Sequence, residues 1–347
     1  MRTPAPRTPR STLSDVASRA GVSVTTASLV LGGKAKNHRI SLETFERVQK
    51  AAGDLDYSPN LLIRSMQRGR THVLSFYNSF RNRLTNDIYM NRLSTAIESA
   101  AGQHGYDVLV HCDFSRSPVD AYRFLNGGQT DGLLLFAPLP DDPLLPLLRR
   151  SRLPVLLINS RDEEGILPSV RDDVGDGMRQ AAEALVDAGH RRVAAITEEG
   201  TSIRDSHERI SLLRSSLHTL GADLPENLVL PYAGDGKALV QRILDDPNPP
   251  TALFCWRDRL AYFLLESCEE LLVPVPQQLA VVGYDGIQWP AATRHVAATV
   301  QVDLQKIADA SIHLIDRCIR GEEIAVSQET IPVSFTRGTT LGPPFPL

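Results

Sequence analysis

The feature that most constrains the fold is an alternation of short apolar runs with longer amphipathic segments, which begins at residue 71. The runs are four or five residues long and rich in Val, Leu, Ile and Ala, as strands buried on both faces are. Repeated β-α units of this kind form doubly wound parallel sheets. We predict strands at 73–77, 107–111, 132–136, 155–158, 193–197, 252–255 and 279–282, and helices at 90–104, 119–126, 144–150, 176–188, 208–220, 239–245 and 258–272. So many elements suit two lobes better than one sheet.

The first seventy residues have a different pattern, that of short helices. Thr12 and Asp15 have the spacing of a capping box, and Gly21 gives the backbone freedom that a tight turn needs. Ser23 is then placed to cap a second helix. The apolar face of the first helix consists of Leu13, Val16, Ala17 and Ala20, at helical spacing.

The second predicted helix has two unlike faces. Ala27, Val30 and Leu31 share the inner face, whereas Val24, Thr25, Ser28 and Leu29 point the other way, where there is no core for them to join. Two helices joined by a turn, with the outer face of the second left open, make a helix-turn-helix that places a recognition helix in a major groove. A third helix follows from a cap at Ser41 to about Asp54.

The charge of the chain is divided unevenly along its length. Residues 1–70 hold 12 Lys and Arg against 5 Asp and Glu, a net charge of +7, whereas residues 71–347 hold 25 against 36, a net charge of −11. The basic excess coincides with the helix-turn-helix, so a polyanion is the expected partner of this part alone.

Several classes of protein lack support in the sequence. No run of eighteen apolar residues and no secretory signal occurs, so we expect a cytoplasmic protein without a membrane segment. The four cysteines are scattered, which argues against a metal site. Phosphate-loop, dinucleotide-binding, nucleophile-elbow and zinc-protease motifs are absent, so we predict neither an enzyme nor a cofactor. A further alternative, a metabolic enzyme with an appended regulatory domain, would require catalytic turnover of the ligand that binds between the lobes.

The helix-turn-helix region resembles the head of the LacI/GalR family of bacterial transcription repressors. The residues that carry this resemblance are LSDVA (13–17), AGVS (20–23), VLGG (30–33), RV (47–48) and YSPN (57–60). The body resembles the effector domain of the same family through GYD (105–107), TDG (130–132), PV (154–155), AGHRRV (188–193), ER (208–209), PTA (250–252), Asp258, VVGYD (281–285) and ATV (298–300).

The resemblance implies a fold and a division into domains. The fold is a small all-α helix-turn-helix DNA-binding domain plus an α/β periplasmic-binding-protein-like core of two doubly wound parallel-sheet lobes. We expect the DNA-binding domain at 11–57, a hinge helix at 58–70 and the effector-binding and dimerisation domain at 71–347. Lobe one is expected at 71–168 and 298–326, and lobe two at 169–297 and 327–347.

The resemblance also implies which residues contact DNA. Val24, Thr25 and Leu29 occupy base-reading positions, although Leu29 can instead pack on the third helix. Apolar side chains at such positions contact thymine methyl groups and not guanine acceptors. Met66 occupies the position of the hinge-helix wedge that enters the minor groove, with packing between subunits as the alternative. The full predicted DNA-binding set is Ser23, Val24, Thr25, Thr26, Ser28, Leu29, Lys34, Asn60, Arg64 and Met66.

Family positions similarly imply an effector site between the lobes, at the carboxyl ends of the strands. Arg209 offers a fork of donors, and Asp285 and Asp173 offer paired acceptors. Arg209 can equally pair with an acidic neighbour, and Asp285 and Asp258 can cap helices. Arg257 stands where relatives commonly have Asn, which favours a ligand with negative charge or many acceptors, such as a sugar acid, a phosphorylated sugar or a nucleotide-like compound. The predicted set is Asp173, Arg209, Trp256, Arg257, Asp258 and Asp285.

Together these features predict a homodimeric repressor that binds a palindromic double-stranded DNA operator. A small-molecule effector, a sugar or sugar derivative, is expected to change its affinity for the operator. The alternative function is a sugar-binding receptor of periplasmic type without a DNA role, which would fit the body alone but not the basic helix-turn-helix head.

Overall fold

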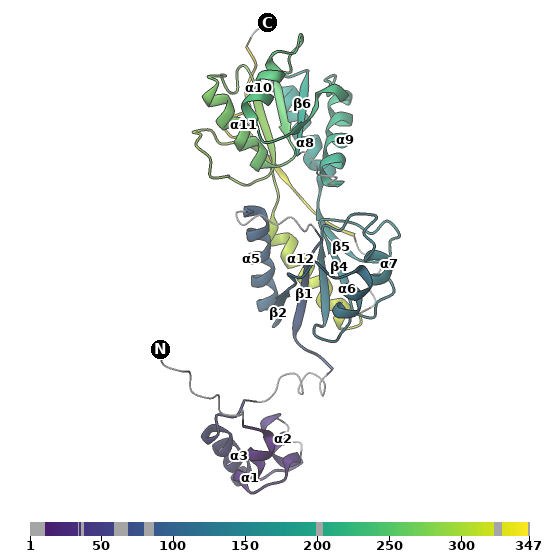
Figure 1. The fold of residues 1–347 in the computed structure, drawn as a ribbon, viewed down its shortest axis with the longest axis vertical. Helices are drawn as coiled ribbons and strands as arrows, with labels where there is room; N and C mark the ends of the chain where they lie inside the picture. The colour runs from purple at the N-terminus through teal and green to yellow at the C-terminus, as the bar shows by residue number, and fades with distance from the viewer. Residues whose placement is uncertain are drawn as a thin grey trace. The chain divides into compact units, whose positions relative to one another are not determined.

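In a computed structural model, the described residues are 11–33, 35, 38–58, 69–79, 87–198, 204–322 and 328–345, with the side chains of residues 204 and 205 left out. The chain divides into two compact units, Met1–Thr71 and His72–Leu347. We describe each unit by itself (Figure 1).

The described part of the first unit is helical. Helices α1 (Leu13–Ala20), α2 (Val24–Leu31) and α3 (Leu42–Asp54) enclose a small apolar core. The side chains of Val16, Val30 and Val48 lie at its centre and are almost fully buried. Such a core is small, so the helix ends have to be well satisfied for the unit to be stable.

The predicted start signals of these helices are confirmed. The Thr12 hydroxyl accepts from the backbone N–H of Asp15 at 3.2 Å, and the Asp15 carboxylate accepts from the backbone N–H of Thr12 at 2.7 Å. Gly21 ends α1 in the left-handed region at φ 64°, where a side chain would be strained. Ser23 and Ser41 cap α2 and α3.

The second unit holds two sheets within the described residues, one in each lobe. The first is parallel, with strand order β11-β5-β4-β3-β1-β2. Helices α5 (Ile88–Gln103) and α12 (Leu304–Ile319) pack on one face of it, and α6 (Pro118–Leu125) and α7 (Leu145–Leu148) on the other (Figure 1). Its strands are β1 (Val73–Asn78), β2 (Asp107–Val110), β3 (Gly132–Phe136), β4 (Val155–Ile158), β5 (Ser169–Asp172) and β11 (Gln328–Ile331).

The second sheet has the strand order β12-β10-β9-β8-β6-β7, and only its edge strand β12 runs antiparallel. Helices α8 (Val174–Asp187) and α9 (Arg204–Thr219) cover one face, and α10 (Gly236–Leu244) and α11 (Asp258–Glu270) cover the other. A short 3-10 turn, η2 (Glu226–Leu228), precedes β7. The strands are β6 (Val193–Glu198), β7 (Val229–Tyr232), β8 (Ala252–Cys255), β9 (Ala280–Asp285), β10 (Ala298–Gln301) and β12 (Ser334–Thr336).

The pairing of the strands corrects the predicted lobe boundaries. The segment 169–172 pairs with β4 and so belongs to lobe one, not to lobe two. The segment 298–301 pairs with β9 and belongs to lobe two, and 328–331 pairs with β5 and belongs to lobe one. Hydrogen bonds to a distant strand decide which sheet a short strand joins, and a local pattern does not contain that information.

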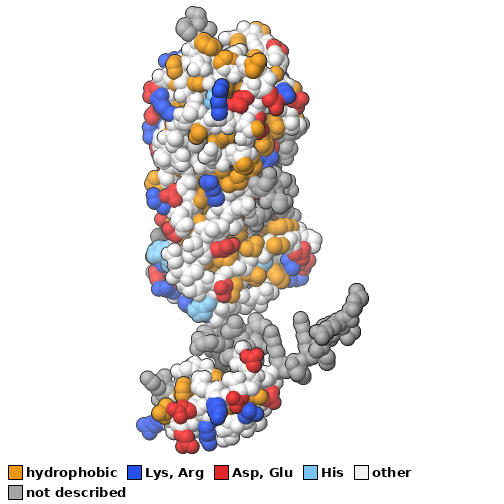
Figure 2. Space-filling view, turned by 90° about the vertical axis from the view of Figure 1, so that its left-hand side faces the viewer, with side chains coloured by type: hydrophobic (Ala, Val, Ile, Leu, Met, Phe, Trp, Pro, Cys, Tyr) orange, Lys and Arg blue, Asp and Glu red, His pale blue; other side chains and the backbone are white. Residues whose placement is uncertain are grey.

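Other features of the fold were not anticipated by the apolar runs. Strands β5, β7, β10, β11 and β12 and helix α12 were missed. Three of these strands, β7, β11 and β12, lie at sheet edges, where exposed positions interrupt the apolar run. No helix among the described residues is both long enough and apolar enough to cross a membrane. Figure 2 shows acidic and basic side chains interspersed over one face of the lobes, with apolar side chains between them.

Candidate DNA-binding and effector-binding sites

The outer face of α2 is the candidate DNA-reading surface. Ser23, Val24 and Thr25 at its start are exposed, and Val24 exposes 47% of its surface. An apolar side chain with this exposure can be reached by a partner molecule. This face therefore has the open character that the pattern predicted.

The polar side chains at the start of α2 are partly engaged by the helix itself. The Ser23 hydroxyl accepts from the backbone N–H of Thr26 at 3.1 Å and bonds the Thr26 hydroxyl at 2.8 Å. Thr26, Ser28 and Leu29 are half-buried. In the described part of this unit, Leu29 is not among the side chains packed against the core, which argues against its packing on α3. The predicted contacts Lys34, Asn60, Arg64 and Met66 lie outside the described residues.

Four of the six predicted effector residues meet in one small cavity between the lobes. Arg209, Trp256, Arg257 and Asp285 line it from lobe two. Its volume is about 80 Å³, well below the roughly 300 Å³ at which ligand pockets begin. The lobes therefore stand close together in this structure. Lobe one contributes Asp87, Tyr89, Met90, Phe136, Ala137 and Asn159.

Arg209 is held in place by contacts on three sides. Its Nη1 donates to the carbonyl oxygen of Trp256 at 2.6 Å and lies 3.7 Å from a carboxylate oxygen of Asp285. The guanidinium lies over the Tyr284 ring, with 3.7 Å from Cζ to the ring centroid. The side chain is almost fully buried, so its position is set before any ligand arrives. Arg209 thus also pairs with an acidic neighbour, Asp285, as the alternative prediction for this residue held.

Asp285 ends β9 with unusual backbone geometry and a perturbed carboxyl. Its φ is 107°, a region that non-glycine residues seldom occupy. Burial raises the pKa of this carboxyl to about 7, although Arg209 and Arg257 act to lower it. A strained, buried carboxyl at the end of a strand is typical of a functional site.

Residues from lobe one complete the cavity and were not predicted. Asn159 follows β4 directly, with φ 52°, and its amide nitrogen donates to the hydroxyl of Tyr89. Its amide oxygen has no hydrogen-bond partner among the described residues. The available signal was position, because Asn159 is the first residue after a predicted buried strand and ligands bind at such ends.

The remaining predicted effector residues, Asp258 and Asp173, do not line the cavity. Asp258 is almost fully buried and accepts from the backbone N–H of Ile287 at 2.6 Å, and burial raises its pKa well above the usual range. Asp173 caps α8, where its carboxylate accepts from the backbone N–H of Asp176 at 2.9 Å. The sequence suggested helix capping for Asp285 and Asp258, but it is Asp173 that caps a helix. The ligand contacts predicted for Asp258 and Asp173 stay predictions, because neither residue lines the cavity.

Two polar contacts join the lobes beside the cavity. The Tyr284 hydroxyl of β9 donates to Asp172 of β5, and both side chains are buried. Arg171 of β5 bonds Glu208 of α9, with 3.0 Å between Nη2 and Oε2. Both pairs lie at the crossing where β5 leads into α8, and each links a strand of the first sheet to lobe two.

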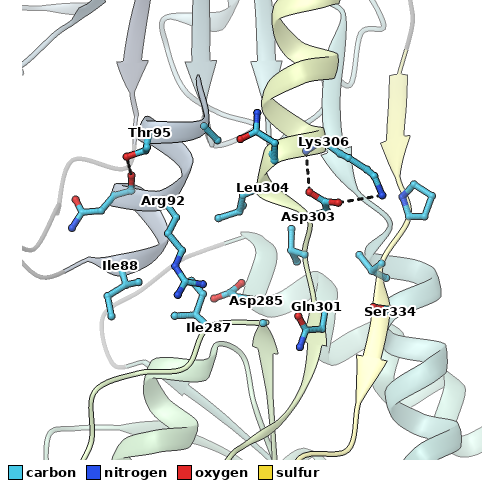
Figure 3. A pocket seen from close by; sticks show the side chains of 17 residues that line it. Ile88, Arg92, Thr95, Asp285, Ile287, Gln301, Asp303, Leu304, Lys306 and Ser334 are labelled. Carbon is cyan, nitrogen blue, oxygen red and sulfur yellow. Dashed lines mark hydrogen bonds and ion pairs between the residues drawn. The ribbon is translucent and has the colours of Figure 1, made fainter. Parts of the chain in front are cut away.

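A larger groove of about 880 Å³ opens beside the cavity, and Asp285 lines both. The groove lies between the start of α5, the start of α12 and the chain crossings between the lobes. In Figure 3 the Arg92 side chain points from α5 toward Asp285, while Asp303 and Lys306 pair with each other at 3.1 Å. A space of this size can accommodate a metabolite where the small cavity cannot.

The comparisons with known proteins agree with this geometry. Residues 12–60 match the model of bacterial regulatory proteins of the lacI family, and residues 182–341 match the model of a periplasmic binding protein-like domain. The chain thus carries a lacI-family helix-turn-helix domain in its first unit and a periplasmic binding protein-like domain in its second. It is a transcriptional regulator with a helix-turn-helix DNA-binding domain joined to an effector-binding domain.

Individual relatives of this regulator match nearly its whole length. The HTH-type transcriptional repressor PurR of Escherichia coli is 26% identical over 345 residues, which are 96% of this chain and 98% of the relative. The Lac repressor dimer bound to operator and the anti-inducer ONPF has a TM-score of 0.81 at 23% identity, covering 96% of this chain and 99% of that one. The transcriptional regulator CelR in complex with cellobiose has a TM-score of 0.69 at 24% identity, covering 95% and 100%.

Proposed function

We propose that this regulator is a repressor that binds a palindromic operator as a homodimer in the cytoplasm. One small helix-turn-helix reads only a half-site, whereas two related by a two-fold axis read both halves of a palindrome. The lacI-family match and the repressor names of its relatives support this proposal. Val24, Thr25 and Leu29 are the proposed base-reading side chains, with Met66 as the proposed minor-groove wedge.

We further propose that a sugar or sugar-derived metabolite is the effector. The observation that carries this proposal is the buried Arg209–Asp285 pair at the carboxyl ends of the strands, facing Asn159 across the cavity. A guanidinium donates to sugar oxygens, and a carboxylate and an amide oxygen accept from hydroxyl groups. The groove beside Asp285 supplies the volume that the cavity lacks.

The closed arrangement of the lobes suggests how ligand and DNA are coupled. A cavity of about 80 Å³ excludes a sugar, so an effector in it would favour a wider separation of the lobes. A ligand that prefers one lobe arrangement shifts the equilibrium toward it and changes operator affinity by the same coupling free energy. This role requires no catalysis, and we propose that the protein is not an enzyme. A receptor without a DNA role is disfavoured by the helix-turn-helix domain.

The test is binding of the purified protein to its own upstream DNA, followed by fluorescence anisotropy at two salt concentrations. The panel of added compounds consists of sugars, sugar acids, phosphosugars and nucleosides. We expect sequence-preferring binding that weakens with salt and that one compound class alters. Sequence-preferring binding that no compound alters would refute the effector role, and binding without sequence preference would refute the repressor assignment.

A further inference from the structure

A compact cationic cluster lies in lobe two beside the cavity, and its member Arg257 lines the cavity. Arg257 and Arg259 flank the start of α11, and both pair with the single carboxylate of Glu198 at the end of β6. The Arg259–Glu198 pair is 3.0 Å long, and the three side chains are each less than one-fifth exposed. The two largely buried guanidinium groups thus share one paired carboxylate, and a buried charge is costly unless it is well paired.

This cluster and the neighbouring Trp256 present donors that lack acceptors. The Nε atoms of Arg257 and Arg259 and the indole nitrogen of Trp256 are buried without a hydrogen-bond partner among the described residues. Trp256 is only 6% exposed and lines the cavity, and the Arg257 guanidinium lies over its ring at 4.6 Å. Unsatisfied buried donors destabilise a site unless an acceptor joins them. A ligand group that satisfies these donors therefore has to be a hydrogen-bond acceptor, and preferably a negatively charged one.

Hydrogen-bond acceptors line another part of the cavity. Asp285 and Asp87 line it together with the acceptor oxygen of Asn159, and these groups suit hydroxyl donors. Burial lowers the pKa of Arg257 even with Glu198, Asp285 and Asp87 near it, so a further anion would stabilise its charged form. A ligand in this site is thus expected to have one anionic end and one hydroxylated end.

We propose that the effector carries a carboxylate or phosphate group, which binds Arg257 and Arg259 in place of the Glu198 side chain. This inference rests on the proposed effector role of the cavity. The planar guanidinium forks match the oxygens of either anion. The start of α11 lies beside them, and Arg257 as its N-cap forms no side-chain cap there, so the helix end adds favourable potential. Glu198 is the carboxylate that holds this position between the two arginines in the structure.

The test uses the intrinsic fluorescence of the full chain. Its two tryptophans, Trp256 and Trp289, lie near this cluster, and a Trp289→Phe variant leaves Trp256 as the reporter. Titration with inorganic phosphate at constant ionic strength, with chloride as the reference anion, is expected to give a saturable change. Arg257→Gln should raise the Kd for phosphate about tenfold or more, since a charge-assisted pair is lost. Arg179→Gln, an exposed arginine of the same lobe, is the matched control.

A second variant protects the test against misfolding. Glu198→Gln removes the competing carboxylate and should tighten phosphate binding severalfold, a gain that an unfolded lobe cannot produce. Glucose, gluconate and glucose 6-phosphate then compete with phosphate, and we expect only the two anions to displace it. Stronger displacement by gluconate would identify a carboxylate, and stronger displacement by glucose 6-phosphate a phosphate.

Three results would overturn the proposal. These are a fluorescence signal that does not saturate, equal phosphate affinity in Arg257→Gln and the unaltered chain, and displacement by glucose as good as by the anions. The outcome of the operator-binding assay does not depend on these three results, because that assay follows labelled DNA and not the tryptophans. The two proposals can therefore be refuted separately.

Discussion

Replacing Asp285 with Asn should make the second lobe less sensitive to pH. Asn keeps the shape of the side chain and tolerates the positive φ of 107° better than most residues. It cannot ionise, so it imitates the protonated carboxyl at every pH. The substitution therefore isolates the cost of charging one buried group.

The magnitude follows from the raised pKa. The carboxyl titrates at about 7 in the folded chain and at an ordinary value of 3.8 when unfolded. The folded state thus holds the proton more tightly, and its stability falls as pH rises between these two values. About three pH units at roughly 1.4 kcal/mol each give a total of about 4 kcal/mol. Between pH 5 and pH 8, about 3 kcal/mol of this loss should be observed.

The assay is urea unfolding of the full chain from pH 5 to pH 8, followed by tryptophan fluorescence. Both tryptophans lie in lobe two, so the signal reports the lobe that contains Asp285. Relative to the unaltered chain, Asp285→Asn should gain about 3 kcal/mol of unfolding free energy between pH 5 and pH 8. Asp187→Asn, an exposed position of the same lobe, should gain nothing. Parallel pH profiles for Asp285→Asn and the unaltered chain would refute the reasoning.

Three further substitutions test other parts of the molecule. Met66→Gly should weaken operator binding with little effect on ligand binding, and unchanged operator affinity would count against wedge insertion. Thr12→Ala removes one half of the capping box and should cost the DNA-binding unit about 1 kcal/mol, measured as a lower thermal midpoint of its unfolding. Tyr284→Phe removes the hydroxyl that donates to buried Asp172 and should lower the unfolding free energy by about 1–3 kcal/mol, and an unchanged urea midpoint would contradict the contact between the lobes.

Local features of this protein were predictable because neighbours in the chain determine them. The capping box at Thr12, the left-handed turn at Gly21 and the caps at Ser23 and Ser41 depend on residues no more than a few positions apart. Buried strands such as β3 and β4 consist of apolar side chains on both faces, so their composition marks them. The position of an effector site at strand ends followed from the β-α order.

The tertiary structure decided which of the candidate residues meet. Arg209 and Asp285 lie far apart in the sequence, and sheet order and helix packing bring them within 3.7 Å. The same packing placed Asn159 in the cavity with them, buried Asp258 outside the cavity lining and left Asp173 as a helix cap. The tertiary structure also brought Arg257 and Arg259 into ion pairs with the same carboxylate, that of Glu198. The sequence alone thus indicated the helix caps, most of the buried strands and the resemblance to a family of repressors, whereas the site depended on long-range hydrogen bonds and burial, which no local pattern encodes.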